Sequence, residues 1–135
     1  MTTRRRLRLR VIPGIFAVCR LGPDDAIPSG IAAGSLLSVT RTPDELSIVC
    51  GEEVAPEAAR CEKGWKCLVV EGPLPFSATG ILASLAGPLA EAEISIFAVS
   101  TFDTDYLLVP RPRIVQAVTA LEAAGHHVDG LNSEA

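Results

Sequence analysis

The amino-acid sequence predicts an α+β protein in which helices cover one face of a sheet. Apolar residues recur every fourth position over residues 77–92, which is typical of an amphipathic helix. Residues 94–100 follow as a short, apolar and partly β-branched run, which favours a strand. Only 4% of the residues are aromatic, so the core must be built from Ala, Val, Ile and Leu. Such thin layers suit a two-layer packing of helices on a sheet.

The first half of the chain is predicted to be rich in strands, with only short helices. Residues 22–25 (Gly-Pro-Asp-Asp) form a break, and Pro28 and Pro56 limit the two helical segments. In chain order we expect strands at residues 7–11 and 16–21, at most a short helix within 26–34, a hairpin from 36–40 and 46–50, and a brief helix within 52–60.

The second half is predicted to be more complete. In chain order we expect a strand at residues 65–70, a helix at 77–92, strands at 94–100 and 106–109, a helix at 114–124 and a last strand from 126 to 128. This βαββαβ order is the ferredoxin-like arrangement. The first half repeats it in abbreviated form. We therefore expect two modules, an abbreviated one at residues 7–62 and a complete one at residues 63–130.

Side-chain patterns predict the ends and faces of these elements. Ser77 is the expected N-cap of the first helix, and Gly125 is the expected left-handed residue after the second. The strand at residues 94–99 is expected to be buried on both faces or nearly so. The first helix should bury Ile81, Leu85 and Leu89, and the second should present Ile114, Val115, Val118 and Leu121 on one face.

Composition argues against a membrane-spanning or secreted protein. Mean hydropathy is +0.34, but Glu91 and Glu93 interrupt the best candidate for the roughly 18 apolar residues of a membrane span. The basic N-terminal segment MTTRRRLRLRVIPGIF lacks the continuous apolar run and cleavage site of a secretory signal. We expect a cytoplasmic location, no membrane partner, and four reduced cysteines that act as core side chains or bystanders: Cys19, Cys50, Cys61 and Cys67.

Metal and nucleic-acid binding have little support in the sequence. No cysteine pair has C-x-x-C spacing, and His126 and His127 are far from the cysteines, so neither a metal site nor a cofactor is expected. The early arginines form a positive patch on a chain of net charge −4, or simply alternate with leucines in a strand. The aromatic rings are scattered in apolar runs instead of forming a stacking platform, so no nucleic-acid partner is expected.

Binding chemistry concentrates in the turn at residues 100–105, which holds two carboxylates, three hydroxyls and one aromatic ring. A carboxylate there can hold an ammonium group, while helix amides next to Gly80 favour an anion. A free amino acid carries both charges. The alternative is that Asp and Thr simply form a hairpin turn with a self-bonded side chain. No nucleophile motif or Gly-rich phosphate loop is present, so an enzyme is not expected.

The same residues carry a family resemblance. The segment GILASLAGPLAEAEISIFAVSTFDTDYLLV resembles the second module of small bacterial proteins with tandem ACT domains, and is similar to the modules of the animal CASTOR-type arginine sensors. FAVCRL, SVTRTPDELSIVC and GWKCLVVEGPLPFS resemble the same family in the same order. ACT domains bind small effectors, mostly amino acids, and transmit binding to an enzyme or partner protein. The resemblance implies the same role here.

The resemblance also implies a set of ligand-binding residues, because the sensors bind arginine between two modules. With one complete module per chain, the second module would come from another copy, which implies a homodimer. Ala83 stands where the sensors offer a contact to the guanidinium, which argues against arginine itself but not against an amino acid. The matching positions are Gly80, Ile81, Thr101, Phe102 and Asp105 on one side of the pocket, and Ser95 and Ile96 on the other.

Three hypotheses from different classes remain at this point. The leading one is a non-catalytic regulatory or sensor protein that binds an amino-acid effector at an ACT–ACT interface. The second is a structural or protein-interaction domain with no bound effector. The third is a small enzyme that uses a cysteine or a carboxylate. Thermal stabilisation by amino acids separates the first two, and harmless alkylation of the cysteines would exclude the third.

Overall fold

The computed structural model describes residues 6–57 and 59–131, and the contacts among them form two units. The helical unit contains residues 6–12 and 66–131, and the strand unit contains residues 13–57 and 59–65. The predicted boundary between modules at residues 62 and 63 stays a prediction. The contacts group the first strand with the second half of the chain, because that strand pairs there.

The sheet of the helical unit has the strand order β6-β7-β5-β1-β8. β1 runs antiparallel to the end of β5 and parallel to β8, and β6 is antiparallel to β7. The order β5-α1-β6-β7-α2-β8 confirms the ferredoxin-like arrangement, with β1 inserted between β5 and β8. The strands are β1 (Arg8–Val11), β5 (Arg60–Val70), β6 (Phe97–Ser100), β7 (Asp105–Pro110) and β8 (His127–Asp129).

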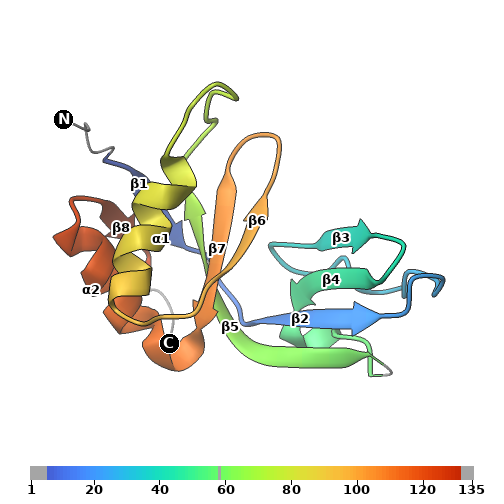
Figure 1. Ribbon diagram of the computed structural model, residues 1–135. Coiled ribbons are helices and arrows are strands. Elements are labelled where there is room, and N and C mark those ends of the chain that lie inside the picture. Colours follow the sequence, from blue (N-terminus) through green and yellow to red (C-terminus); the bar gives the residue numbers. More distant parts are fainter. Residues whose placement is uncertain (1–5, 58, 132–135) are drawn as a thin grey trace. The chain divides into compact units, whose positions relative to one another are not determined.

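Two helices, α1 (Ile81–Glu91) and α2 (Ile114–Ala123), pack side by side against this sheet (Figure 1). The short 3₁₀ helix η2 (Arg111–Arg113) leads into α2. Alternate residues of the strands face the helices, which gives the core one continuous apolar layer. Its buried members are Leu9, Val11, Leu68, Val70, Leu85, Leu89, Ile94, Leu107, Val109, Ala117, Val118, Leu121 and Val128.

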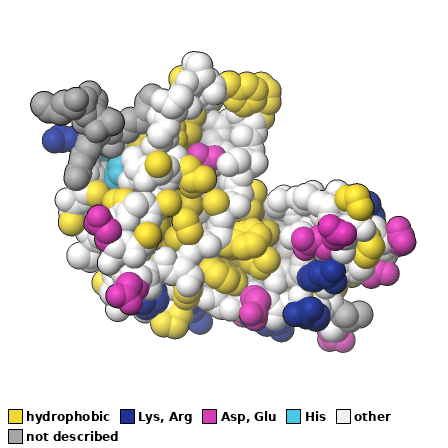
Figure 2. Space-filling model, in the orientation of Figure 1, with side chains coloured by type: hydrophobic (Ala, Val, Ile, Leu, Met, Phe, Trp, Pro, Cys, Tyr) yellow, Lys and Arg dark blue, Asp and Glu magenta, His cyan; other side chains and the backbone are white. Residues whose placement is uncertain are grey.

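The predicted helix faces are largely correct. Ile81, Leu85 and Leu89 are buried along α1, as their spacing predicts. Val115 was expected on the buried face of α2, but its side chain is 58% exposed, and Ala117 is buried instead. Hydrophobic side chains on the outer surface of the helices face solvent in Figure 2. Val115 lies about 100° around the helix from its neighbours in sequence, so only one of Ile114 and Val115 can point fully inward.

The predicted cap of α1 is wrong, whereas the predicted end of α2 is confirmed. α1 begins at Ile81 and has Gly80, with φ 75°, at its N-cap, so Ser77 lies before the helix and does not cap it. At the other helix, Gly125 adopts φ 100°, and its N–H donates to the carbonyl of Glu122 at 3.0 Å. Only glycine takes these left-handed conformations without strain.

β6 is shorter and more exposed than its sequence predicts. It begins at Phe97, and its four residues alternate between half-buried and exposed. The prediction of burial on both faces is therefore wrong. The physical reason is its position at the end of the strand order, next to β7, where sheet and helices cover it only in part.

The strand unit is an antiparallel sheet of order β3-β4-β2-β5. Its strands are β2 (Phe16–Leu21), β3 (Ser38–Arg41), β4 (Leu46–Gly51) and the start of β5. The described part of this unit contains no α-helix: the segment 26–34 is irregular, and the helix expected at 52–60 is reduced to η1 (Glu52–Val54). Proline disfavours helix in both segments, and glycine does so in the segment 26–34 as well. β5 begins earlier than predicted, at Arg60.

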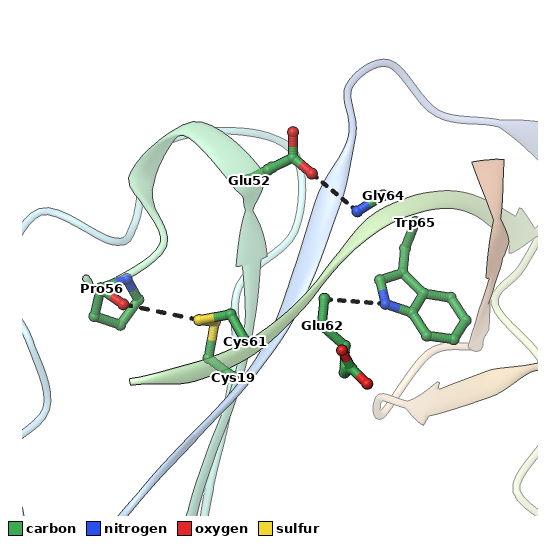
Figure 3. The surroundings of a disulfide bond; sticks show 7 residues. All are labelled: Cys19, Glu52, Pro56, Cys61, Glu62, Gly64 and Trp65. Carbon is green, nitrogen blue, oxygen red and sulfur yellow. Dashed lines mark hydrogen bonds between the residues drawn. A yellow bond between two sulfur atoms is a disulfide. The ribbon is translucent and has the colours of Figure 1, made fainter. Parts of the chain in front are cut away.

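A disulfide joins β2 to β5 within the strand unit (Figure 3). Cys19 and Cys61 are register partners on neighbouring strands, with Cα atoms 4.1 Å apart. The prediction that all four cysteines are reduced is therefore wrong for this pair. The two cysteines are 42 residues apart in the sequence, so nothing local indicates that they pair. Cys50 and Cys67 are free and buried, as expected of core side chains.

None of the helices in the described residues is both long and apolar enough to cross a membrane.

Candidate functional site

A cavity of about 390 Å³ lies in the helical unit between the start of α1 and the turn that joins β6 to β7. Three segments line it: the loop around residues 74–78, residues 80–82 at the start of α1, and the turn at residues 100–105. A cavity of this size is within the usual range for small-molecule sites. The chain therefore brings its most polar turn and a helix N-terminus to one pocket.

Hydrogen bonds fix the conformation of the turn. The N–H of Thr101 donates to the carbonyl of Thr104 at 2.8 Å, and the N–H of Thr104 donates to Oγ1 of Thr101 at 3.3 Å. The Thr104 hydroxyl is buried and donates to the carbonyl of Val70 on β5 at 2.7 Å. These bonds tie the turn to the centre of the sheet, so the side chains at its edge have a defined position.

Asp105 is the half-buried carboxylate of the pocket. It pairs with Ser100 across the β6–β7 ladder, and the Ser100 hydroxyl donates to Oδ1 of Asp105 at 2.6 Å. A carboxylate can accept about four hydrogen bonds, so this contact leaves capacity for a ligand. Asp103 is exposed at the tip of the turn, and its backbone carbonyl accepts a 2.7 Å bond from the N–H of Leu74.

Gly80 gives the pocket open access to the first turn of α1. No side chain caps this helix, and a Cβ atom at Gly80 would meet no other atom within 4 Å. The first amide groups of a helix lack partners within the helix and favour an anion. Ile81 and Leu82, the first two residues of α1, also line the cavity. The pocket thus offers amide donors on one wall and the carboxylate of Asp105 on another.

Two aromatic rings also line the cavity. The rings of Phe76 and Phe102 have centroids 4.5 Å apart and planes tilted by 60°, and they are 75% and 78% exposed. The space-filling view shows hydrophobic surface at the tip of the loop between β5 and α1 (Figure 2). Phe102 belongs to the predicted set, but sequence reasoning missed Phe76. Its position in a proline-rich loop could have indicated it, because loops lie at the surface and a phenylalanine there is seldom buried in the core.

Five of the predicted site residues meet at this cavity and two do not. Ser95 is exposed, and Ile96 is half-buried against the core of the helical unit. Both precede β6, whose other end, at Ser100, reaches the cavity. From Ile96 to Ser100 an extended chain spans about 13 Å. The five residues that line the cavity are Gly80, Ile81, Thr101, Phe102 and Asp105.

Thiol and metal chemistry find no support in the described residues. Burial raises the pKa of the Cys67 thiol to about 12. Burial, followed by the nearby carboxylate of Glu53, also raises the pKa of the Cys50 thiol. Neither cysteine lines the cavity, and a protonated thiol is a poor nucleophile. Within residues 6–57 and 59–131, no cluster of three His, Cys, Asp or Glu side chains could hold a metal ion.

Comparisons with known proteins agree with this architecture. Residues 60–123 match the family model of the ACT domain, and residues 14–58 match the model of an N-terminal domain. The chain is 41% identical over 70 residues to the cytosolic arginine sensor for mTORC1 subunit 1 of Bos taurus. That match covers 51% of this chain but 20% of the sensor, so the chain spans only about a fifth of that relative.

Solved structures extend the similarity over nearly the whole chain. A protein from Agobacterium tumefaciens is 40% identical, with a TM-score of 0.86 over 92% of both chains. The regulatory subunit of aspartate kinase from Thermus thermophilus is 13% identical, with a TM-score of 0.58 over 82% of this chain and 93% of that one. The latter supports the fold alone. Together with the matched domains, these similarities show that the chain belongs to the ACT-domain family and resembles its CASTOR-type members.

Proposed function

We propose that the protein is a non-catalytic regulatory module that binds a free amino acid in the cavity between Gly80 and Asp105. One observation carries the proposal: a single cavity holds both a half-buried carboxylate and an uncapped helix N-terminus. The α-ammonium group of an amino acid would bind Asp105 through charge-assisted hydrogen bonds. Its α-carboxylate would face the first amides of α1, where the helix dipole favours negative charge.

A curated relative supports an effector role of this kind. The Bos taurus protein, which is 41% identical over 70 residues, is named as a cytosolic arginine sensor. By analogy, we propose that this protein acts in the cytoplasm and passes the binding event to an enzyme or partner protein. By the family resemblance, Ala83 stands where the arginine sensors offer a contact to the guanidinium, so the effector need not be arginine.

We further propose that the working form is a homodimer. Ser95 and Ile96 lie at the opposite end of β6 from the cavity, so they could reach a bound effector only from a second copy of the chain. Two-fold dimers are the commonest closed assemblies, and such a dimer would form two equivalent sites. Light scattering at micromolar concentration should give about twice the monomer mass of 14.2 kDa. A mass equal to the monomer would exclude this part of the proposal.

A thermal-shift screen across the common amino acids tests the binding proposal directly. A ligand at a hundred times its Kd adds about 2.7 kcal/mol of stability. For a chain of 135 residues this raises Tm by roughly 8 °C. We expect a shift of this size for a small group of amino acids and not for most. If every amino acid at 10 mM leaves Tm unchanged, the protein is better described as an interaction domain with no effector.

A further inference from the structure

We propose that the effector carries an apolar side chain of medium to large size, such as that of leucine, methionine or phenylalanine, which packs against the Phe76–Phe102 pair. This inference rests on the proposed amino-acid site and names the class of amino acid that the site prefers. It follows from what the cavity offers beyond the groups that would hold the ammonium and carboxylate.

The apolar part of the cavity wall has no cover within the described chain. Phe76 and Phe102 are 75% and 78% exposed although their rings touch, and Leu82, which lines the same cavity, is 38% exposed. Contiguous exposed aromatic surface next to polar groups is typical of a binding site. A ligand side chain that lies on these rings would remove apolar surface from water on both partners.

The charged side chains of the cavity disfavour an acidic effector. Among the described residues that line it, only Asp103 and Asp105 are charged. A second carboxylate on the ligand, as in aspartate or glutamate, would face like charge, and none of these described lining residues is basic to offset it. Binding such a ligand would therefore lose free energy through repulsion and desolvation.

The side chain of a basic effector would add little binding free energy. Once Asp105 holds the α-ammonium group, Asp103 is the remaining carboxylate for a guanidinium or side-chain ammonium. Asp103 is exposed at the tip of the turn, where water and salt screen its charge. A long basic side chain would also cover the aromatic rings with a hydrated charged end. The hydrophobic wall therefore contributes more free energy to the binding of an apolar side chain than Asp103 contributes to the binding of a basic one.

The site has room for such a ligand. The cavity of about 390 Å³ exceeds the volume needed for the backbone part of an amino acid, which leaves space for a side chain beyond Cβ. Phe102 belongs to the same turn as Asp105, and Phe76 lies in the loop directly before Gly80. A ligand held by its charged groups at Asp105 and α1 would thus have its side chain next to both rings.

Calorimetric titration of the full chain with leucine, methionine, phenylalanine, alanine, arginine, lysine and aspartate tests this ranking. We expect the three large apolar amino acids to bind at least tenfold more tightly than alanine, arginine or lysine, and aspartate to bind weakest. Phe76→Ala should weaken leucine binding about tenfold and leave alanine binding nearly unchanged. Val115→Ala, an exposed apolar position outside the cavity, is the matched control and should change neither.

The outcomes separate this inference from the function on which it rests. Tightest binding of arginine or lysine would overturn the inference and leave amino-acid binding intact. Equal binding of leucine and alanine would do the same. Failure of all seven amino acids to bind would overturn both. If a melt shows that Phe76→Ala is unfolded, Phe76→Leu is titrated in its place. If Phe76→Leu then weakens the binding of phenylalanine less than it weakens the binding of leucine, the result argues against contact between the ligand and the Phe76 ring.

Discussion

The Ser100 hydroxyl donates a 2.6 Å hydrogen bond to Oδ1 of Asp105, directly across the ladder between β6 and β7. The two residues are strand partners, so the backbone pairing itself holds the hydroxyl beside the carboxylate. This contact orients the carboxylate before any ligand arrives. Orientation in advance lowers the entropy that binding would otherwise cost.

The first prediction concerns this orienting bond. Ser100→Ala should weaken amino-acid binding about tenfold, because a hydrogen bond to a charged group contributes on the order of 1.5 kcal/mol or more. Stability should change by less than about 1 kcal/mol, since both side chains are accessible to water. Titration calorimetry gives the affinity and urea unfolding gives the stability. Unchanged affinity would show that Asp105 needs no support from Ser100.

The second prediction concerns His126, which is 5% exposed and links the residue before β1 to helix α1. Its Nδ1 accepts from the N–H of Leu7 at 3.1 Å, and its Nε2 lies 3.0 Å from the carbonyl of Ser84 on α1. This geometry assigns the ring hydrogen to Nε2. His126→Ala should cost about 2–3 kcal/mol, because it leaves a backbone donor and acceptor without a partner in the interior. Urea unfolding measures the loss.

The adjacent histidine is a matched control. His127 is exposed and contacts Asp129, with Nε2 2.8 Å from Oδ1. Exposed pairs of this kind contribute little, so His127→Ala should cost less than about 1 kcal/mol. Equal losses for the two variants would contradict the role assigned to His126.

The third prediction concerns the disulfide. Closing a loop over a separation of 42 residues stabilises the folded chain by about 4 kcal/mol in the chain-entropy model. The strand unit should depend on it, because the core cluster around the disulfide is small: Ala17, Cys19, Ile31, Leu46, Ile48 and Cys50. A reducing agent should lower the stability of the wild type and leave a Cys19→Ser/Cys61→Ser variant unchanged. Four reactive thiols in the denatured, unreduced protein would show that the bond does not form.

The fourth prediction concerns alkaline pH. Burial raises the pKa of the Cys67 thiol to about 12, from its ordinary value of 9.0. Between these values the unfolded chain has lost the proton and the folded chain keeps it, so stability falls as the pH rises through this window. At pH 10.5 the loss attributable to Cys67 should be about 2 kcal/mol relative to pH 8.

Comparison with a Cys67→Ala variant isolates the loss of stability that is due to Cys67, because lysine and tyrosine titrate in the same pH range in both proteins. The variant should be less stable at pH 8 but should lose less stability between pH 8 and pH 10.5. An identical loss in both proteins would indicate that the Cys67 thiolate is accommodated in the folded state.

The sequence predicts the second half of the fold well because its signals are local. The spacing of Ile81, Leu85 and Leu89 places α1, and Gly125 marks the end of α2. The cap at Ser77 fails for a physical reason: Gly80 adopts a left-handed conformation that starts the helix later, and the residues before it serve the pocket instead. The N-cap preference of serine alone cannot predict this outcome.

Features that depend on pairing between distant segments could not be predicted. The register of β2 against β5 brings Cys19 opposite Cys61, and that register follows from a long β5 that begins at Arg60. The position of β1 between β5 and β8 likewise depends on pairing between segments that are distant in the sequence. The turn of the candidate site could be predicted, because Thr101, Phe102 and Asp105 are close together in the sequence. Phe76 could not, because its loop contacts that turn only in the folded chain.

Calorimetric titration of Asp105→Asn, beside Asp103→Asn, tests the central claim most directly. The tightest amino acid from the thermal screen is the ligand in both titrations. If Asp105 holds the ammonium group, Asp105→Asn should weaken binding by roughly 1.5–3 kcal/mol, which is about 10- to 150-fold, with the fold intact. Asp103, exposed at the tip of the turn, should tolerate the same change with little loss. Wild-type affinity in Asp105→Asn would contradict the account and remove this residue from the site.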